Sequence, residues 1–145
     1  MSPDDSPEVA FKRLDNGLPA FRRLYPNDAG ADLVALEDTI IPSGATARLA
    51  TNIAIALPDG HYAVVGGRSG LNSAGILTHL GIIDPGFRGQ ILVTTTNLSG
   101  EPFAVRSGDR IAQLIVLPLV LPAYHEVDAL PASPRGERGF GSSGR

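Results

Sequence analysis

The chain has 145 residues, of which 43% are hydrophobic and 19% charged, which is the composition of one globular domain and not of a disordered chain. The absence of cysteine excludes disulfides and thiolate metal sites. The net charge is −3 and the 12 basic residues are scattered, which argues against a polymeric nucleic acid as a partner.

Neither the N-terminal residues nor the longest apolar stretch has the pattern of a targeting or membrane signal. Residues Met1–Glu8 are acidic and contain proline, and they lack the basic and apolar stretches of a signal peptide. The longest apolar stretch, Leu114–Leu121, is interrupted by Pro118 and is too short to span a bilayer. We therefore expect a cytoplasmic protein with no membrane partner, in which Met1–Glu8 are disordered.

Short strands separated by turns dominate the pattern. The 17 glycines and 12 prolines are spaced along the chain and divide it into short segments. Four segments are rich in alternating or β-branched apolar residues and are predicted to be strands. They are Ala45–Leu57, Tyr62–Val65, Gln90–Thr96 and Arg110–Leu117. At most two helical turns are expected after Ser69, so the predicted fold is all-β, a sandwich, jelly roll or barrel in one domain over residues 1–130.

Two carboxylates four residues apart flank a glycine in the first polar motif, Asn27–Leu33. The motif is too short for a calcium loop of the EF-hand type, which needs about 12 residues. Two readings of Asp32 remain open: it can hold a hydrated Mg²⁺ indirectly, or pair with an arginine.

The second motif, Gly66–Leu71, combines flanking glycines with Arg68 and Ser69. A guanidinium, a hydroxyl and backbone N–H groups together suit a phosphate. The same letters also make an ordinary turn, and both readings stay open.

The third motif, Gly81–Gly89, places Asp84 at the end of an apolar run, before Pro85 and Gly86. A carboxylate fixed in this way can orient and deprotonate a water molecule. The alternative is that Asp84 only begins a turn and that Phe87 is a core residue.

Two further segments carry polar groups of interest. In Gly108–Leu114, Gln113 interrupts an apolar strand, and a buried amide needs hydrogen-bond partners. The segment Pro131–Arg145 has four glycines, three arginines and one aromatic residue, so it is either a disordered tail or an arm that becomes ordered on a ligand.

The three histidines are isolated, so no zinc site is expected.

Taken in order, five segments resemble the five motifs of the trimeric dUTPase family. They are Asp28–Leu33, Gly67–Leu71, Gly81–Gly89, Gly108–Val116 and Arg135–Gly144. The resemblance implies a jelly-roll protomer, a homotrimer with active sites between subunits, and a C-terminal arm, Pro131–Arg145, that closes each site. It also implies Mg²⁺-dependent hydrolysis of dUTP to dUMP and pyrophosphate, which keeps uracil out of DNA and supplies dUMP for thymidylate synthesis.

The resemblance also implies roles for individual residues. Asp84 is the expected general base, and Asp32 is expected to position waters of the metal ion, which is held mainly by the triphosphate. Phe87 stands where tyrosine is usual, and its ring is expected to pack against deoxyribose and exclude a 2′-hydroxyl. The other expected substrate contacts are Arg68, Ser69, Gly70, His79, Ile83, Gln113, Arg135, Phe140, Gly141, Ser142 and Ser143. Among these, Arg135, Ser142 and Ser143 are assigned to the β- and γ-phosphates, and Phe140 to the uracil.

The stretch Ile76–Gly81 corresponds to the β-hairpin whose backbone reads uracil in this family. Here His79 and Leu80 stand where small residues or asparagine are commoner, so the strictness of base selection is left open. The rival with a related fold, dCTP deaminase, needs a glutamate and an arginine where this chain has Thr94 and Ser73. A further rival is a trimer that binds nucleotide and a protein partner without catalysis, which turnover would exclude.

Overall fold

The computed structural model describes residues 5–144, and within them the chain is almost entirely β-structure. The strands are β1 Ala10–Arg13, β2 Ala31–Val34, β3 Thr39–Ile41, β4 Thr46–Ala56, β5 His61–Gly66, β6 Ile76–Thr78, β7 Gly81–Ile83, β8 Gln90–Asn97, β9 Phe103–Val105 and β10 Arg110–Pro118. A single short helix, α1 Ser69–Ser73, lies between β5 and β6 in the described part of the chain. The all-β fold class is confirmed.

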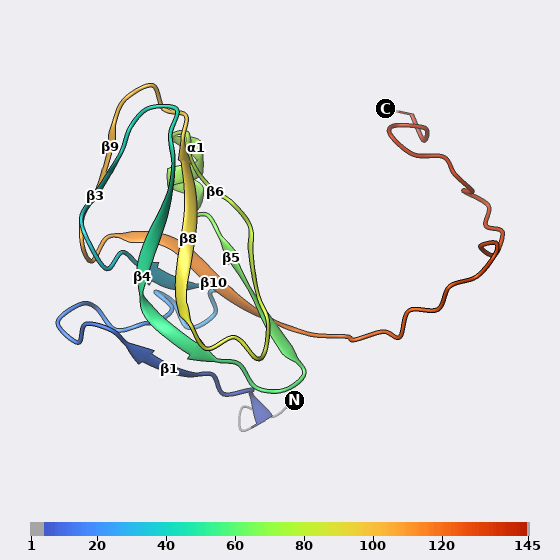
Figure 1. The fold of residues 1–145 in the computed structure, drawn as a ribbon, viewed down its shortest axis with the longest axis horizontal. Coiled ribbons are helices and arrows are strands. Elements are labelled where there is room, and N and C mark those ends of the chain that lie inside the picture. The colour runs from blue at the N-terminus through green and yellow to red at the C-terminus, as the bar shows by residue number, and fades with distance from the viewer. Residues whose placement is uncertain (1–4, 145) are drawn as a thin grey trace.

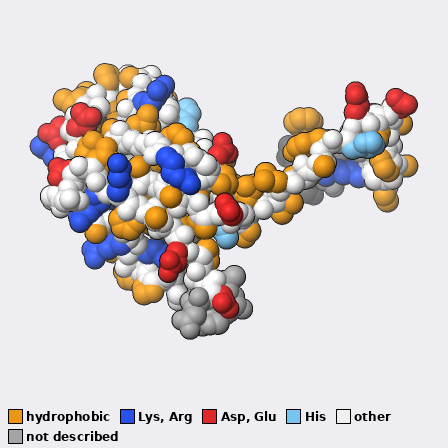
Figure 2. All heavy atoms as spheres, turned by 60° about the horizontal axis from the view of Figure 1, so that its bottom comes forward, with side chains coloured by type: hydrophobic (Ala, Val, Ile, Leu, Met, Phe, Trp, Pro, Cys, Tyr) orange, Lys and Arg blue, Asp and Glu red, His pale blue; other side chains and the backbone are white. Residues whose placement is uncertain are grey.

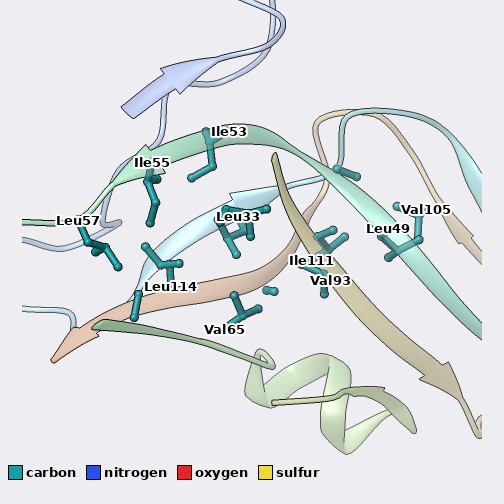
Figure 3. Packing of buried hydrophobic residues seen from close by; sticks show 14 of the residues in the cluster. Leu33, Leu49, Ile53, Ile55, Leu57, Val65, Val93, Val105, Ile111 and Leu114 are labelled. Atoms are coloured by element: carbon teal, nitrogen blue, oxygen red, sulfur yellow. The ribbon is translucent and has the colours of Figure 1, made fainter. Parts of the chain in front are cut away.

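The strands form two four-stranded antiparallel sheets and one two-stranded sheet (Figure 1). The strand orders are β1-β4-β8-β6, β2-β10-β5-β7 and β3-β9. Apolar side chains from the two larger sheets point toward one another and form the core between them (Figure 3). In the first sheet these include Ile53 and Val93, and in the second Leu33, Val65 and Leu114. The architecture is therefore a β-sandwich.

Period-two alternation explains the strands that the sequence predicted. In β8, residues 91, 93, 95 and 97 are buried and the intervening residues are more exposed. In β4 the alternation gives way to continuous burial from Leu49 to Ile55, apart from the half-buried Ala50. The register between β4 and β8 shifts between Ala50 and Ala54, and β4 pairs with β1 on its other edge from Ile53 to Ala56. All four predicted strands and the short helix after Ser69 are confirmed, with ends that agree within one residue or two.

The stretch Ile76–Gly81 differs from the expected hairpin. Within the residues described, β6 pairs with β8 in one sheet, while β7 pairs with β5 in the other. The two strands diverge because Ile76 is buried opposite Asn97, whereas Gly81 lies against Val65. The His79–Leu80 turn is therefore a corner between the two sheets, and the strands on either side of it are not bonded to each other.

The C-terminal residues leave the sandwich after β10. Leu119 donates its backbone N–H to the Gly60 carbonyl at 2.8 Å, and every residue from Val120 to Arg138 is exposed. Figures 1 and 2 show the chain running away from the body, with apolar side chains along its length. We call residues 5–119 the body, Val120–Leu130 the linker and Pro131–Arg145 the arm; Arg145 lies outside the described residues. The predicted domain boundary at residue 130 stays a prediction.

Of the segment predicted to be disordered, residues 1–4 lie outside the described residues, and Asp5–Glu8 are exposed and belong to no strand. Among residues 5–144, no helix is long and apolar enough to cross a membrane.

Candidate active site

A pocket of about 340 Å³ brings together residues from three of the predicted motifs. Its lining consists of Asp32, Arg68, Ser69, Gly70, Leu71 and Gln113. All but Leu71 were predicted to contact substrate or metal-bound water. They come from β2, from the junction of β5 with α1, and from β10.

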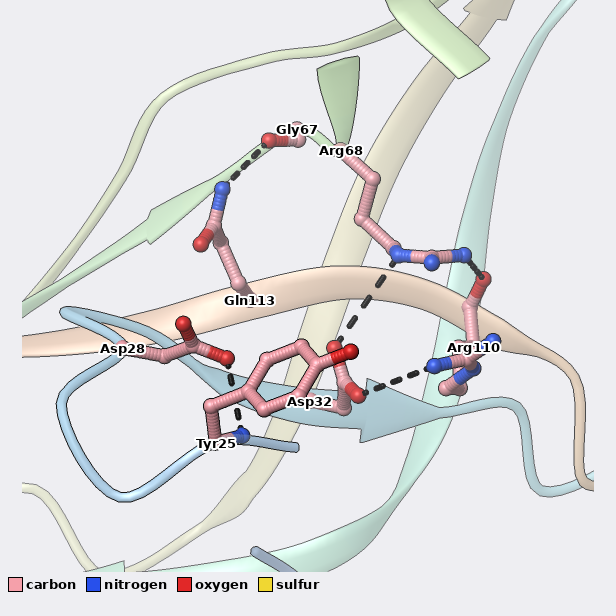
Figure 4. A network of polar contacts seen from close by, with 7 residues as sticks. All are labelled: Tyr25, Asp28, Asp32, Gly67, Arg68, Arg110 and Gln113. Carbon is pink, nitrogen blue, oxygen red and sulfur yellow. Dashed lines mark hydrogen bonds and ion pairs between the residues drawn. The ribbon is translucent and has the colours of Figure 1, made fainter. Parts of the chain in front are cut away.

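Strand register explains why these residues meet. The strand β10 lies between β2 and β5, and Gln113 is opposite Asp32 on one side and Gly66 on the other. Arg68 lies two residues after the end of β5, and Ser69, the next residue, begins α1. Three segments far apart in the sequence are therefore fixed at neighbouring positions by two hydrogen-bonded ladders (Figure 4).

The amide of Gln113 has the partner that its half-buried position requires. Its Nε2 donates to the Gly67 carbonyl at 2.9 Å, which ties β10 to the loop before α1 (Figure 4). On the opposite side lies Gly30, where a β carbon would sit 2.9 Å from Gln113 Cβ and 3.0 Å from its Cδ. Glycine at position 30 thus leaves the space that the Gln113 side chain occupies.

Asp32 lies between two guanidinium groups. Its Oδ1 is 3.9 Å from Arg68 Nε, and its Oδ2 is 3.5 Å from Arg110 Nη1 (Figure 4). Arg68 Nη1 also donates to the Arg110 carbonyl at 3.1 Å. All three side chains remain partly exposed, so the ion pairs contribute little stability. One carboxylate against two cations leaves a local positive charge, which suits an anionic ligand.

Arg110 is the site residue that the sequence analysis missed. It sits at the start of β10, directly after a Gly108-Asp109 turn, where an arginine reads as an ordinary exposed residue. Its contact with Asp32 depends on the pairing of β2 with β10, in which Arg110 is opposite Val34. Only the register of these two strands reveals the pair.

Asp84 and Phe87 occupy a tight turn after β7. The Phe87 N–H donates to the Asp84 carbonyl at 3.1 Å, and Arg88 Nη1 donates to the carbonyls of Pro85 at 2.7 Å and Phe87 at 3.1 Å. The Asp84 side chain is exposed and does not line the pocket of Asp32, Arg68 and Gln113. Phe87 is 45% exposed, so its alternative reading as a core residue is wrong. Ile83, just before the turn, packs against the core.

The His79 side chain is directed toward β8. Its backbone N–H donates to the Thr94 carbonyl at 2.9 Å, and its Nε2 is 2.7 Å from Thr96 Oγ1. Thr96 Oγ1 in turn lies 2.7 Å from Thr46 Oγ1 on β4. The imidazole therefore anchors the corner between β6 and β7 to the first sheet, and a contact of His79 with substrate remains a prediction.

The predicted arm residues are not brought to the pocket within this one chain. Arg135, Phe140, Gly141, Ser142 and Ser143 all lie beyond the exposed linker (Figure 1). Hydrogen bonds between arm residues are local, such as Ser142 N–H to the Gly139 carbonyl at 3.2 Å and Arg135 Nε to the Arg138 carbonyl at 2.7 Å. A single body therefore supplies one part of the predicted site, and its own arm does not complete it.

The carboxylate at the pocket is compatible with Mg²⁺. Among residues 5–144, no three or more His, Cys, Asp or Glu side chains are close enough to hold an ion by themselves. Mg²⁺ retains several waters and is usually bound through one or two carboxylates and substrate phosphates. Asp32, beside a cationic pocket that suits phosphate, fits Mg²⁺ that arrives with a polyphosphate.

Comparisons with known proteins agree with this geometry. The family model described as dUTPase matches residues 17–144. The chain is 46% identical over 140 residues to the deoxyuridine 5′-triphosphate nucleotidohydrolase of Thermobifida fusca, covering 94% of this chain and 78% of that one. It is 42% identical over 144 residues to the protein of the same name from Rhodococcus erythropolis, covering 97% and 88%.

A solved structure shows the same architecture. The dUTPase of Staphylococcus bacteriophage 80alpha, determined with dUPNHPP, superimposes with a TM-score of 0.87 and 26% identity, covering 95% of this chain and 99% of that one. The match to the family model extends over both the body and the arm. The chain belongs to the dUTPase family.

Proposed function

We propose that this dUTPase family member hydrolyses dUTP to dUMP and pyrophosphate with Mg²⁺. The observation that carries the proposal is the pocket in which Asp32, Arg68 and Gln113 meet, with a second arginine, Arg110, beside it. A polyphosphate needs concentrated donors and positive charge, and this pocket supplies both.

Arg68, Ser69, Gly70 and Gln113 bind the phosphates in this proposal. A guanidinium can donate two parallel hydrogen bonds to phosphate oxygens, and the Ser69 hydroxyl and nearby backbone N–H groups add further donors. Arg68 Nη1 is held by the Arg110 carbonyl, whereas the 3.9 Å contact between Nε and Asp32 is loose and leaves that side of the guanidinium open to a ligand. Gln113 keeps its position through the Gly67 carbonyl.

Asp32 holds waters of the Mg²⁺ ion that accompanies the triphosphate. The ion, when bound, neutralises charge on the phosphate oxygens and orients the polyphosphate chain. Arg68 and Arg110 keep the Asp32 carboxylate at the edge of the pocket, where a metal-bound water can reach it.

Asp84 is the general base. Its carboxylate accepts a proton from the attacking water, whose oxygen forms a bond to the α-phosphorus as the bond to the bridging oxygen breaks and pyrophosphate leaves. The turn bonds of Phe87 and Arg88 hold the backbone of Asp84 in place, so the chain itself provides the positioning that in-line attack requires.

The corner between β6 and β7 and the ring of Phe87 select the nucleoside. The backbone of the corner meets the edge of uracil through groups other than the His79 N–H, which is bonded to the Thr94 carbonyl. The Phe87 ring packs against deoxyribose and excludes a 2′-hydroxyl. Loss of the phenol oxygen relative to tyrosine keeps the ring and therefore the sugar selection.

A homotrimer completes each site. Large apolar side chains on and near β6, β7 and β8 are exposed in the single chain: Leu77, Leu80, Ile82 and Leu92. Burial of such side chains against another copy would remove apolar surface from water. The arm of another subunit then supplies Arg135, Ser142 and Ser143 to the β- and γ-phosphates and Phe140 to the uracil, with Gly141 between them.

Pyrophosphate release from a panel of deoxynucleoside triphosphates with Mg²⁺ tests the proposal. We expect release from dUTP and little from dCTP or dTTP. Formation of dUTP from dCTP would instead identify a deaminase, and tight dUTP binding without release would identify a binding protein. Native mass spectrometry of the same sample measures whether the chain is a trimer.

A further inference from the structure

Gly89 lies in the space next to the ring of Phe87. A β carbon built on Gly89 would lie 2.7 Å from Phe87 Cζ, 3.1 Å from Cε2 and 3.4 Å from Cε1. Carbon atoms pack at about 3.5–4.0 Å, so the ring occupies the volume that any side chain at position 89 would need.

Backbone conformation gives no other reason for glycine at this position. The φ angle of Gly89 lies outside the left-handed region that favours glycine, unlike that of Gly75 or Gly108. An L-residue can therefore adopt the Gly89 backbone, and the three nearest obstacles to its β carbon all belong to one aromatic ring.

The ring can move while the turn stays. Phe87 is 45% exposed, so its side chain has solvent into which to rotate. The turn that presents Asp84 is held by the Phe87 N–H bond to the Asp84 carbonyl and by Arg88 Nη1 on the Pro85 carbonyl. Neither bond involves the side-chain position of residue 89, so a methyl group there displaces the ring and leaves Asp84 in place.

We propose that Gly89 is a positioning residue: its lack of a side chain leaves the space in which the Phe87 ring lies against the sugar, and this sets the selection of deoxyribose over ribose. The inference rests on the proposed hydrolysis of dUTP and on the role of Phe87 in it. Excluding a 2′-hydroxyl requires the ring to stay in one position, and a ring displaced by about 1 Å no longer does so.

The test is the Gly89→Ala variant, with kcat and KM measured for dUTP and UTP. We expect the ratio of kcat/KM for dUTP over UTP to fall by about tenfold or more, the range that one misplaced contact in a pocket produces. The KM for dUTP should rise while kcat at saturation changes little, because Asp84 is not displaced. An unchanged ratio overturns the proposal.

Two controls make the result specific. Gly86→Ala adds the same methyl group in the same turn, where nothing lies within 4 Å of a β carbon, and it should leave the dUTP/UTP ratio unchanged. In a Phe87→Ala background, where the ring is gone, Gly89→Ala should have no further effect on the ratio. An equal loss of selectivity in both backgrounds contradicts a role through the ring.

Folding is measured by thermal unfolding of the wild type and the four variants. If Gly89→Ala alone does not fold, the added Phe87→Ala should restore folding, and failure to do so overturns the proposal. The wild type separates this inference from the proposed function: if it releases no pyrophosphate from dUTP, the function fails, whereas an active wild type with an unchanged ratio in Gly89→Ala rejects only the role of Gly89.

Discussion

The pocket lined by Asp32, Arg68 and Gln113 holds its side chains in a different way from the arm. In the pocket, two strand ladders and the hydrogen bond from the Gln113 amide to the Gly67 carbonyl hold Asp32 and Gln113 in place, and Arg68 is bonded to the Arg110 carbonyl. In the arm, hydrogen bonds are local and Phe140 is fully exposed. The pocket is assembled by the same folding that buries the core, whereas the arm buries too little to offset the entropy of ordering itself. In the proposed function, the groups that must stay fixed belong to the body, and the groups that close over the ligand belong to the arm.

The prediction with the largest expected effect tests whether the catalytic base lies in the body. Asp84→Asn keeps the shape of the side chain but removes the base, so kcat should fall by about 10²–10⁴-fold while binding of dUPNHPP is retained. Pyrophosphate release and calorimetric titration measure the two quantities. Asp59→Asn, in an exposed turn elsewhere in the body, is the matched control. Wild-type turnover in Asp84→Asn would remove Asp84 from the mechanism.

A second prediction compares the stability of the two regions. Ile91 is fully buried in the core, so Ile91→Ala should lower the free energy of unfolding by about 2–5 kcal/mol. Phe140→Ala should leave the urea midpoint unchanged without nucleotide, because the ring contacts solvent. A comparable loss of stability in Phe140→Ala would mean that the arm is part of the same cooperative unit as the body.

A third prediction asks whether one site uses two chains. Co-expression of Asp84→Asn with a chain truncated after Leu130 gives mixed trimers from two inactive variants. If Asp84 and the arm of each site come from different subunits, about one quarter of the sites are intact by simple probability in a symmetric oligomer. The fifteen residues from Pro131 can extend roughly 50 Å at about 3.3 Å each, enough to cross a subunit.

The readout of this experiment is pyrophosphate release per trimer. Activity no higher than that of the two variants measured separately would show that the arm serves the subunit that supplies Asp84. Native mass spectrometry must show mixed trimers for the comparison to hold.

The smallest expected effect tests whether the body satisfies all of its own hydrogen bonds. Within residues 5–144, the buried hydroxyls of Thr95 and its cross-strand neighbour Thr78 have no hydrogen-bond partner. An unsatisfied buried hydroxyl is destabilising, so Thr95→Val should raise the stability by about 1 kcal/mol. Thr51 donates to the Ile91 carbonyl at 2.6 Å, so the matched change Thr51→Val should lower it. Urea unfolding compares the two, and a loss of stability in both would contradict the assignment.

Much of the body could be predicted because its long strands carry a local signal. Alternation over eight residues identifies β8, and the apolar run identifies β4. The three-residue strands β3 and β9 escaped prediction because they are too short for a period to appear and are defined by pairing with each other. The divergence of β6 and β7 likewise depends on which neighbour each strand finds.

The sequence predicted only those site residues that lie in recognisable motifs. Asp32, Arg68 and Gln113 stand in motifs, and the structure brings them together. Arg110 was missed because its partner is set by strand register and not by spacing in the sequence. The proposed meeting of Asp84 with the arm could not be tested on one chain, since the proposal makes it a property of the trimer.

In the proposed trimer, the composition of the linker affects how often the arm reaches a site. Val120–Leu130 is exposed, follows Pro118 and contains Pro122, and the arm begins at Pro131. Proline fixes φ, so this tether samples fewer end-to-end distances than a glycine-rich chain of equal length. The effective concentration of the arm at its site is then set by the match between the span of the tether and the distance to be crossed. If the arm completes the site as proposed, a few residues inserted or removed in the linker would change catalysis without touching any group that contacts the nucleotide.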